Sequence, residues 1–442
     1  MNTFRKISFV FFCFLISNAG LKAQTKNIIS PSNKYIQYMG RVDFSNPEKP
    51  LFAYPNVTIK AKFEGTSIDL LIKHYNGNYT SNYFVSIIDG GAPVKFQVTS
   101  AQQTYSIASN LSTGQHTVEI IKVTESDCGE CEFLGFQIDN GASLLAPDPL
   151  PNLKIEFFGN SITCGYGIEG GARPSFDNSY KAYAAVAARQ LNAQIHTTSY
   201  SGIGVVNGYP PFLMKDMYNR TIAITSYYPF PTNNTWDFTR FIPDVVIVAL
   251  GTNDYSKGFN AVTFKPGYTD LIAQIRIAYP NSFIICTNSP MVSNSTLGAS
   301  INEVVANLKT AGDNKIHYFS FTSMIGGGYN GHPCVADGQT HGKQLADFIK
   351  TILPPTSISQ VIENKADFTV FPNPTKKFLS VKSAVNADFI EISDLSGKIV
   401  EKIKVSLPGE VYIDISHIVK GTYLFSTING NDLKVTRKVC KL

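Results

Sequence analysis

Short β-rich runs, separated by Gly, Asn, Asp or Pro, dominate the chain between residues 27 and 145. Clear examples are the runs at 57–63, 67–74, 83–89 and 116–123. Strands at such turn-rich intervals are typical of an all-β sandwich or barrel. The pattern therefore predicts an N-terminal β-sandwich domain. It is followed by a stiff linker, because three prolines lie between positions 145 and 151.

Strand-like and helix-like runs alternate between residues 152 and 354. Residues 244–250 are apolar without alternation, which is typical of a strand covered on both faces. Other predicted strands are 154–158, 282–289 and 315–321, and predicted helices are 180–191, 268–278, 300–310 and 342–353. This exchange predicts an α/β domain, a three-layer arrangement with a parallel sheet between two layers of helices. Ligands bind such sheets at the carboxyl ends of the strands.

The last part of the chain, residues 368–442, is β-rich again and follows Pro354, Pro355 and a polar stretch. Its predicted strands are 378–382, 389–393, 398–405, 411–415 and 422–427. Roughly seventy residues are enough for a small β-sandwich of its own.

The N-terminal residues 1–23 have the pattern of an export signal. Arg5 and Lys6 precede an apolar run at 7–16, and small residues lead to a cleavage point between Ala23 and Gln24. The run is too short to span a bilayer, and no later run is long enough. The sequence therefore predicts an exported protein with no transmembrane segment.

Charge and cysteine spacing exclude two classes of function. The net charge is only +5, from 38 Lys and Arg against 33 Asp and Glu, and no dense basic cluster with interleaved aromatics occurs. Nucleic-acid binding therefore has no support. Cys128 and Cys131 have CxxC spacing, but a second pair or paired histidines would be needed for zinc. A local disulfide or two unpaired thiols are the alternatives, with no metal site.

Four chemically distinctive residues follow predicted strands of the middle domain or precede its last helix: Ser161, Gly202, Asn253 and His332. Acyl transfer requires a nucleophile, a base and donors for the oxyanion. Ser161 is the candidate nucleophile and His332 the candidate base. The backbone N–H groups of Ser161 and Gly202 and the side-chain amide of Asn253 are the candidate oxyanion hole. This chemistry needs no metal or organic cofactor.

The motifs that carry these residues are Gly-Asn-Ser-Ile-Thr (159–163), Ser-Gly-Ile-Gly (201–204), Gly-Thr-Asn-Asp (251–254) and Asn-Gly-His-Pro (330–333). In this order they resemble the four blocks of SGNH (GDSL-like) hydrolases, with Asn160 where the usual block has Asp. The runs at 40–43, 63–67, 114–118 and 122–125 are similar to the jelly-roll-like β-sandwich that precedes the hydrolase domain in carbohydrate esterase family 2. The resemblance covers nearly all of residues 27–353. It implies deacetylation of hemicelluloses such as xylan or glucomannan, with acetylated poly- or oligosaccharide as the partner.

The group that orients the ring of His332 is left open by the sequence. Many SGNH enzymes have an Asp two or three residues before the His, a position that is not acidic here. The side-chain carbonyl of Asn330 or a backbone carbonyl is the candidate, which makes a Ser–His dyad the plain interpretation. The rival base is His341 with Asp337, but the His-Pro dipeptide favours His332.

Four more residues have alternative interpretations. Asp254 is expected to orient its loop and to take no part in the chemistry. Cys164 and Cys334 follow the Ser and the His closely, which suggests a disulfide across the site. Trp236, the only tryptophan, is either a core residue or a platform for a sugar ring.

The tail contains Phe-Pro-Asn-Pro-Thr (371–375), Ile-Ser-Asp-Leu-Ser-Gly-Lys (392–398) and Gly-Thr-Tyr (421–423), and ends in a basic segment. It resembles the C-terminal sorting domain of type IX secretion, which implies the type IX machinery as a partner and a secreted or cell-surface location. A small carbohydrate-binding or adhesion module is the alternative for this segment.

Two other functions compete with the serine esterase. One is a non-catalytic cell-surface glycan-binding protein, against which the intact Ser161, Asn253 and His332 argue. The other is a lipase-like esterase, which would require an apolar lid or acyl channel that the sequence does not show. The sequence leaves open which polysaccharide and which hydroxyl position are deacetylated.

Overall fold

The structure, a computed structural model, describes residues 26–292, 296–353, 368–394, 398–429 and 432–442. The predicted signal peptide lies outside these residues. The chain divides into two compact units, Met1–Ile358 and Ser359–Leu442.

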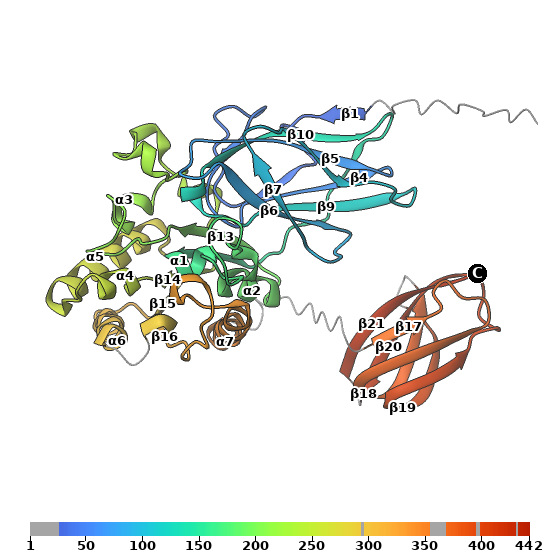
Figure 1. Ribbon diagram of the computed structural model, residues 1–442. Coiled ribbons are helices and arrows are strands. Elements are labelled where there is room, and N and C mark those ends of the chain that lie inside the picture. Colours follow the sequence, from blue (N-terminus) through green and yellow to red (C-terminus); the bar gives the residue numbers. More distant parts are fainter. Residues whose placement is uncertain (1–25, 293–295, 354–367, 395–397, 430–431) are drawn as a thin grey trace, which may run out of the picture. The chain divides into compact units, whose positions relative to one another are not determined.

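Two antiparallel sheets form the N-terminal part of the first unit (Figure 1). One sheet contains β1 (Lys26–Ile29), β3 (Leu51–Phe52), β5 (Ile68–Tyr75), β8 (Thr104–Ala108) and β10 (Glu130–Asp139). The other contains β2 (Gln37–Met39), β4 (Thr58–Glu64), β6 (Ser81–Ile88), β7 (Val94–Thr99), β9 (Gln115–Lys122) and β11 (Leu144–Leu145). Alternate residues of β4 (Ile59, Ala61 and Phe63) are buried against residues of the facing sheet such as Leu70 and Phe136. The predicted β-sandwich is confirmed, since period-two burial requires two covered inner faces.

A five-stranded parallel sheet follows, in the order β13-β12-β14-β15-β16. Its strands are β12 (Lys154–Gly159), β13 (Gln194–Ser199), β14 (Val245–Ala249), β15 (Phe283–Thr287) and β16 (Ile316–Phe319). The helices are α1 (Ser161–Cys164), α2 (Tyr183–Gln190), α3 (Met214–Met217), α4 (Thr252–Ser256), α5 (Ala261–Ala278), α6 (Thr296–Thr310) and α7 (Val335–Ile352). Short 3₁₀ helices are η1 (Ser126–Cys128), η2 (Ser179–Lys181), η3 (Thr225–Tyr227), η4 (Thr232–Asn234), η5 (Phe238–Arg240), η6 (Pro290–Val292) and η7 (Tyr329–Gly331).

Each face of the parallel sheet has its own hydrophobic core. Phe157 and Ile247 belong to the cluster that contains residues of α2 and α7. Their strand neighbours Phe158 and Val248 belong to the cluster that contains residues of α5 and α6. The strands are apolar without alternation because helices cover both faces, which confirms the three-layer α/β/α prediction. Helices α5 and α7 both begin earlier than predicted.

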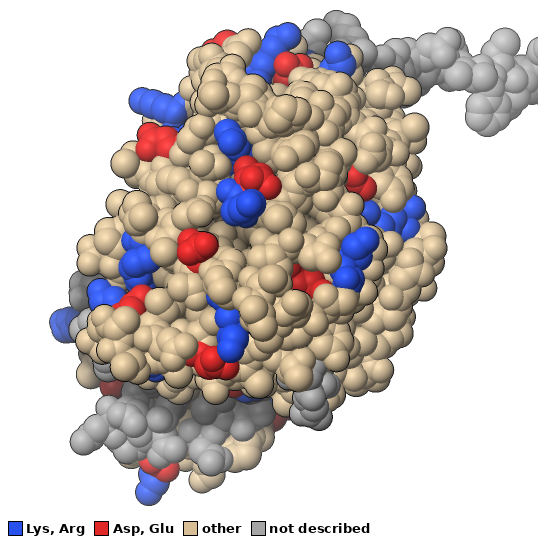
Figure 2. Space-filling model, turned by 90° about the vertical axis from the view of Figure 1, so that its left-hand side faces the viewer, with Lys and Arg blue, Asp and Glu red and all other residues tan. Residues whose placement is uncertain are grey.

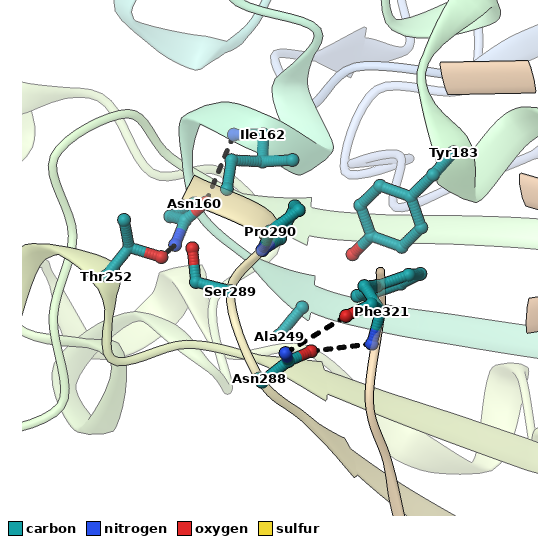
Figure 3. Close-up of a pocket in the computed structure, with 9 residues that line it drawn as sticks. All are labelled: Asn160, Ile162, Tyr183, Ala249, Thr252, Asn288, Ser289, Pro290 and Phe321. Atoms are coloured by element: carbon teal, nitrogen blue, oxygen red, sulfur yellow. Dashed lines mark hydrogen bonds between the residues drawn. The ribbon is translucent and has the colours of Figure 1, made fainter. Parts of the chain in front are cut away.

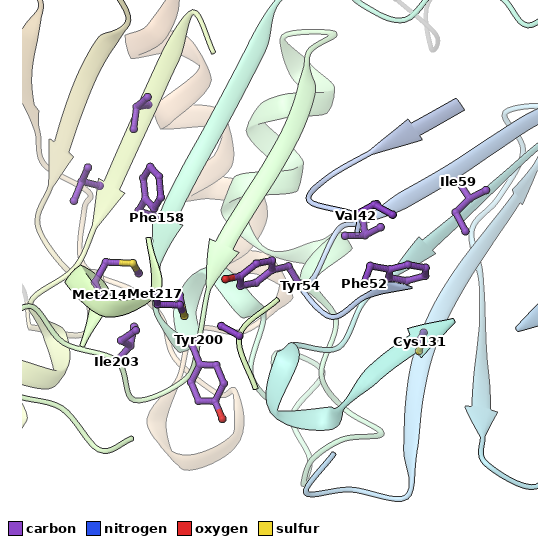
Figure 4. Close-up of a cluster of buried hydrophobic side chains, with 14 of the residues drawn as sticks. Val42, Phe52, Tyr54, Ile59, Cys131, Phe158, Tyr200, Ile203, Met214 and Met217 are labelled. Carbon is purple, nitrogen blue, oxygen red and sulfur yellow. The ribbon is translucent and has the colours of Figure 1, made fainter. Parts of the chain in front are cut away.

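The N-terminal sandwich and the parallel sheet share one core. Figure 4 shows Val42, Phe52 and Tyr54 of the sandwich in the same buried cluster as Phe158 and Met214 of the α/β domain. The two parts are therefore packed against each other through a continuous hydrophobic core.

A buried ion pair crosses the same contact. The guanidinium Nη2 of Arg41 lies 2.7 Å from Oε1 of Glu156, and both side chains are at most 1% exposed. Arg41 also donates to the carbonyl groups of Tyr218 and Arg220, at 2.7 and 2.8 Å. A buried charge pair is tolerated only when its remaining hydrogen bonds are satisfied, as they are here.

The second unit is an antiparallel β-structure with a core of its own. Its strands are β17 (Phe368–Phe371), β18 (Phe378–Asp394), β19 (Ile399–Asp414), β20 (Gly421–Asn429) and β21 (Asp432–Lys441). Leu379, Ile390, Phe425 and Val439 are among its fully buried side chains. The predicted short strands merge into the long β18 and β19 because the ladder continues through register shifts. The basic C-terminal segment forms β21, which the sequence did not indicate.

On the face shown in Figure 2, acidic and basic side chains are interspersed. Within the described part of the chain, no helix combines the length and the apolar character needed to cross a bilayer.

Candidate active site

The candidate nucleophile lies on the turn between β12 and α1. Ser161 is the first residue of α1 and is 6% exposed. The preceding Asn160 caps this turn, because its side-chain carbonyl accepts the N–H of Ile162 at 3.0 Å. Its amide nitrogen donates to Thr252 Oγ1 at 3.1 Å (Figure 3). An Asn at this position can both accept and donate, so it ties the nucleophile turn to the turn after β14.

The candidate base lies directly against the nucleophile. Nε2 of His332 is 2.8 Å from Oγ of Ser161, although the two residues are far apart in the sequence. Nδ1 lies 3.0 Å from the carbonyl oxygen of Tyr329, an acceptor only, so Nδ1 carries the proton. Nε2 therefore has a free lone pair to accept the proton of Ser161. Burial lowers the pKa of His332, partly opposed by the Tyr329 hydrogen bond, which favours the neutral base.

The ring of His332 is therefore oriented by a backbone carbonyl. The side chain of Asn330 instead donates to the hydroxyl of Tyr166 at 3.4 Å. Asn330 adopts a left-handed conformation, with φ 51° and ψ 40°, in the turn that presents the Tyr329 carbonyl to the ring. Of the two alternatives that the sequence left open, these contacts favour a backbone carbonyl over the Asn330 side chain.

The candidate oxyanion donors face the same cleft. Ser161, Gly202, Asn253 and His332 line an open cleft of about 450 Å³ at the carboxyl ends of the parallel strands. The side-chain amide of Asn253 donates one hydrogen to Ile203 O at 2.8 Å, and its second hydrogen remains free for a ligand. Within the described residues, the backbone N–H groups of Ser161 and Gly202 donate to no backbone carbonyl in a turn, loop or cap. Three donors are therefore available to an oxyanion.

Asp254 holds the loop that carries Gly202. Its carboxylate accepts the backbone N–H groups of Val205, Val206 and Asn207 at 2.8–3.1 Å. Burial raises the pKa of Asp254, and these three hydrogen bonds act in the opposite direction. Asp254 thus has a structural role, as expected, but the loop it holds is the neighbouring one at 202–207 and not its own.

The rival base does not reach the nucleophile. His341 lies in α7, is 2% exposed, and its ring centroid is 5.3 Å from that of Phe321 in the core. The carboxylate of Asp337 accepts the backbone N–H groups of Ile325 and Gly326 at 2.6 and 2.9 Å. The pair is structural, and the alternative assignment is wrong.

Trp236 is not a sugar platform. It is 3% exposed, and the guanidinium groups of Arg240 and Arg41 lie over its ring at 4.7 and 5.3 Å. The indole ring is therefore inside the protein, where a sugar ring cannot stack on it, and the core interpretation applies.

The suggested disulfide between Cys164 and Cys334 is not present, and for Cys128 and Cys131 the unpaired-thiol alternative applies. Cys128, Cys131, Cys164 and Cys334 are all free. The thiol of Cys164 donates to Ser199 Oγ at 3.3 Å instead of pairing with Cys334. Among the described residues, no cluster of His, Cys, Asp or Glu forms a metal site.

Two tyrosines complete the cleft, and sequence reasoning missed both. The ring of Tyr166 stacks on that of His332, with centroids 4.4 Å apart and planes inclined by 27°. Tyr209 is 62% exposed in the same cleft, and its hydroxyl is 3.2 Å from Ser256 Oγ. Tyr166 lies in the Gly-Tyr-Gly run that follows the nucleophile motif, which was the available signal. Nothing in the sequence distinguishes Tyr209 from a buried tyrosine.

Three family models match the chain: carbohydrate esterase 2 N-terminal over residues 38–148, GDSL-like lipase/acylhydrolase over 157–348, and secretion system C-terminal sorting domain over 369–441. The cellulase/esterase CelE of Acetivibrio thermocellus is 36% identical over 336 residues, covering 73% of this chain and 40% of that protein. The chain thus spans less than half of that relative. An acetylxylan esterase / glucomannan deacetylase of Cellvibrio japonicus is 28% identical over 336 residues, covering 70% of this chain and 84% of the relative.

Solved structures give the same family. A family two carbohydrate esterase from Clostridium thermocellum, solved in complex with cellohexaose, is 37% identical with a TM-score of 0.65. The match covers 72% of this chain and 98% of that one. A family two carbohydrate esterase from Cellvibrio japonicus has the same fold, with a TM-score of 0.67 at 24% identity over 74% of this chain and 98% of that one. The chain belongs to carbohydrate esterase family 2.

Proposed function

We propose that this chain is a secreted serine esterase that hydrolyses O-acetyl esters of hemicellulose, either xylan or glucomannan, through a Ser161–His332 dyad. The observation that carries the proposal is the 2.8 Å contact between Ser161 Oγ and His332 Nε2, with the other ring nitrogen held by a carbonyl. A nucleophile and an oriented base at this distance are the minimum equipment for acyl transfer.

In the acylation step, Ser161 Oγ attacks the acetyl carbonyl and its proton passes to His332 Nε2. The carbonyl oxygen becomes an oxyanion, which accepts hydrogen bonds from the N–H groups of Ser161 and Gly202 and from the amide of Asn253. His332 then gives the proton to the sugar oxygen as the C–O bond breaks. The sugar hydroxyl leaves, and Ser161 carries the acetyl group.

In the deacylation step, water attacks the acetyl-serine while His332 Nε2 accepts one of its protons. The same three donors hold the second oxyanion. The proton returns to Ser161 Oγ when the bond to the acetyl carbon breaks, and acetate leaves. The imidazolium that forms in each step is held by the Tyr329 carbonyl, which accepts the Nδ1 hydrogen.

The cleft supports a carbohydrate substrate better than a lipid. Its lining includes Ser201, Ser256, Asn330 and two tyrosines, with Met291 as a flexible aliphatic side chain. A carbohydrate presents hydroxyl groups and an apolar ring face, which polar groups beside exposed aromatic rings match. An acyl channel for a long chain would instead need a mostly apolar lining. The relatives named for activity on acetylxylan and glucomannan support this choice.

The deciding measurement is acetate release from acetylated xylan and acetylated glucomannan by the wild type, Ser161→Ala and His332→Ala. We expect both variants to lose nearly all activity while they keep the wild-type unfolding temperature. A wild type that releases no acetate from either polymer would overturn the proposal.

A non-catalytic glycan-binding role is the second candidate, because the Clostridium thermocellum relative was solved with cellohexaose. Calorimetric titration of the wild type and of Ser161→Ala with unacetylated oligosaccharide, combined with the esterase assay, distinguishes the two roles. Tight binding of unacetylated oligosaccharide by a wild type without esterase activity would favour the binding role.

Export is part of the proposal: the predicted signal at 1–23 and the matched sorting domain support secretion by the type IX machinery.

A further inference from the structure

The N-terminal sandwich contributes a carboxylate to the rear of the active site. Glu125 follows β9 and is 1% exposed. Its Oε2 accepts the backbone N–H of Ser201 at 2.6 Å, and its Oε1 accepts the hydroxyl of the same residue. Ser201 directly precedes Gly202, a candidate oxyanion donor. A residue of the sandwich therefore holds the oxyanion loop from behind.

The same carboxylate pairs with Arg173, which lies in the segment 165–178 between α1 and η2. Nε of Arg173 is 2.8 Å from Asp177, and its guanidinium lies over the ring of Tyr166 at 4.6 Å from the centroid. The same Tyr166 ring also stacks on the ring of His332. Arg173 therefore fixes an aromatic ring that in turn fixes the base.

A second route reaches the base through the backbone. Asp177 accepts the N–H of Gly167 at 2.7 Å, and the carbonyl of Gly167 accepts the N–H of Tyr329 at 3.0 Å. Tyr329 supplies the carbonyl that orients His332. At Gly167 a Cβ would lie 2.3 Å from the Cβ of Tyr329, so the two backbones pack together only because this residue is glycine.

The sandwich also holds the far end of the segment 165–178. Nζ of Lys95, on β7, lies 2.6 Å from a carboxylate oxygen of Glu169. The same Nζ donates to the carbonyl groups of Ser175 and Asp177 at 2.7 and 2.8 Å. The segment that carries Tyr166 is thus fixed to the sandwich at more than one point.

From these contacts we infer that Glu125 and Arg173 are positioning residues of the esterase reaction, and that the N-terminal sandwich sets the geometry of both the oxyanion loop and His332. The inference rests on the proposed Ser161–His332 chemistry. It assigns the sandwich a part in catalysis in addition to any glycan contact. Neither residue is among those that line the cleft, so both act through Ser201, Tyr166 and Tyr329.

A loss of activity caused by lower stability has to be distinguished from a loss caused by displaced catalytic groups. The pair Arg41–Glu156 provides the matched control, because it is buried between the same two parts of the chain. Glu156 accepts from Thr198 and Tyr279, neither of which lines the catalytic cleft. Glu125→Gln and Glu156→Gln therefore both remove a buried carboxylate beside an arginine, but only the first lies behind the active site.

The kinetic test compares kcat and KM for 4-nitrophenyl acetate in Glu125→Gln, Arg173→Lys and Glu156→Gln. We expect kcat to fall about tenfold to a hundredfold in the first two with KM nearly unchanged, since displacement of reacting groups by about 1 Å costs on this order. We expect Glu156→Gln to lower the unfolding temperature and to keep kcat within about twofold. Equal losses of kcat in Glu125→Gln and Glu156→Gln would overturn the inference.

A spectroscopic test does not depend on turnover. The Tyr166 ring shields the ring protons of His332, whose NMR signals are assigned by their absence in His332→Gln. We expect these signals to move in Arg173→Lys and Glu125→Gln but not in Glu156→Gln. If Arg173→Lys does not fold, Tyr166→Leu is used in its place, and we expect it also to move the His332 ring signals. Tyr166→Phe keeps an aromatic ring, so its His332 signals and its kcat should both stay closer to the wild-type values than those of Tyr166→Leu.

The two tests separate the proposals. Unmoved signals in folded Glu125→Gln and Arg173→Lys would overturn the positioning role while leaving a Ser161-dependent esterase intact. If the signals move in the two variants but the wild type has no esterase activity, the proposed function is overturned, and the positioning role in an esterase reaction is overturned with it.

Discussion

At the scale of single residues, the ring of His332, the proposed base, is held by the carbonyl of Tyr329, which carries only a partial charge. A carboxylate at this place would raise the pKa of His332, whereas burial here lowers it, against the weaker effect of the Tyr329 hydrogen bond. The protonated ring cannot accept the Ser161 proton, so kcat/KM is lost as the pH falls through this pKa. We therefore expect a midpoint below the usual 6.5 of histidine and a plateau at neutral pH. A pH profile of 4-nitrophenyl acetate hydrolysis with a midpoint above 6.5 would contradict this.

Asn330 offers a second test at this scale, because its backbone conformation and its side chain have separate roles. The left-handed φ of 51° costs about 1 kcal/mol for a residue such as Ala and nothing for Gly. If the turn matters and the side chain does not, kcat should follow the order Asn330→Gly above Asn330→Ala. Kinetics and thermal unfolding of both variants measure this. An equal loss of kcat in the two variants would instead indicate that the side chain of Asn330 orients His332.

The residues that sequence could identify are those fixed by local chemistry. Ser161 and Asn253 follow buried strands, so a strand pattern and a motif were enough to find them. Trp236 could not be assigned in this way, because its burial depends on Arg41 and Arg240, which come from distant parts of the chain. Tyr209 was missed for the same reason, since exposure in a cleft is a property of the folded chain.

At the scale of elements, the loop between β13 and α3 carries Gly202, the proposed oxyanion donor. Its φ is 80°, and a Cβ there would lie 2.9 Å from Tyr209 Cβ, so an alanine must shift the loop. We expect Gly202→Ala to lower kcat at least tenfold, in line with about 10²–10³ for a lost oxyanion donor. Gly258→Ala is the matched control, with φ of 92° and nothing within 4 Å of the added Cβ. It should lose a similar stability, roughly 1–2 kcal/mol, without the loss of kcat. Comparable kcat values in the two variants would remove Gly202 from the oxyanion hole.

Strand positions could be predicted better than helix starts. The apolar run of β14 determines a buried strand by itself, whereas α5 extends through Pro266 and Gly267, which favour a break. Its true start is set by Asn260, whose side chain accepts the N–H of Val262 at 2.9 Å. A cap of this kind is a geometric property, and Asn is equally common in turns.

At the scale of the whole molecule, composition divides the chain into three parts, but the packing divides it into two compact units. The sandwich and the α/β domain share a core and the Arg41–Glu156 pair, and the sandwich reaches the active site through Glu125. The proline-rich linker near position 150 therefore joins two parts that depend on each other. Hydrophobic patterning could not reveal this, because it reports which residues are buried and not which partner covers them.

This division predicts opposite results for two truncations. A chain that ends at Leu353 removes strands whose buried residues, such as Leu379 and Phe425, form a cluster among themselves. It should keep the kcat and unfolding temperature of the full chain. A chain that begins at Asn152 would expose Phe158 and leave Glu156 without Arg41, an uncompensated buried charge that costs about 3–5 kcal/mol. Since whole domains are stable by only about 5–15 kcal/mol, we expect it to be unfolded or inactive by circular dichroism and esterase assay. A folded, fully active α/β domain alone would show that the sandwich contributes neither to the core nor to the positioning of the catalytic residues.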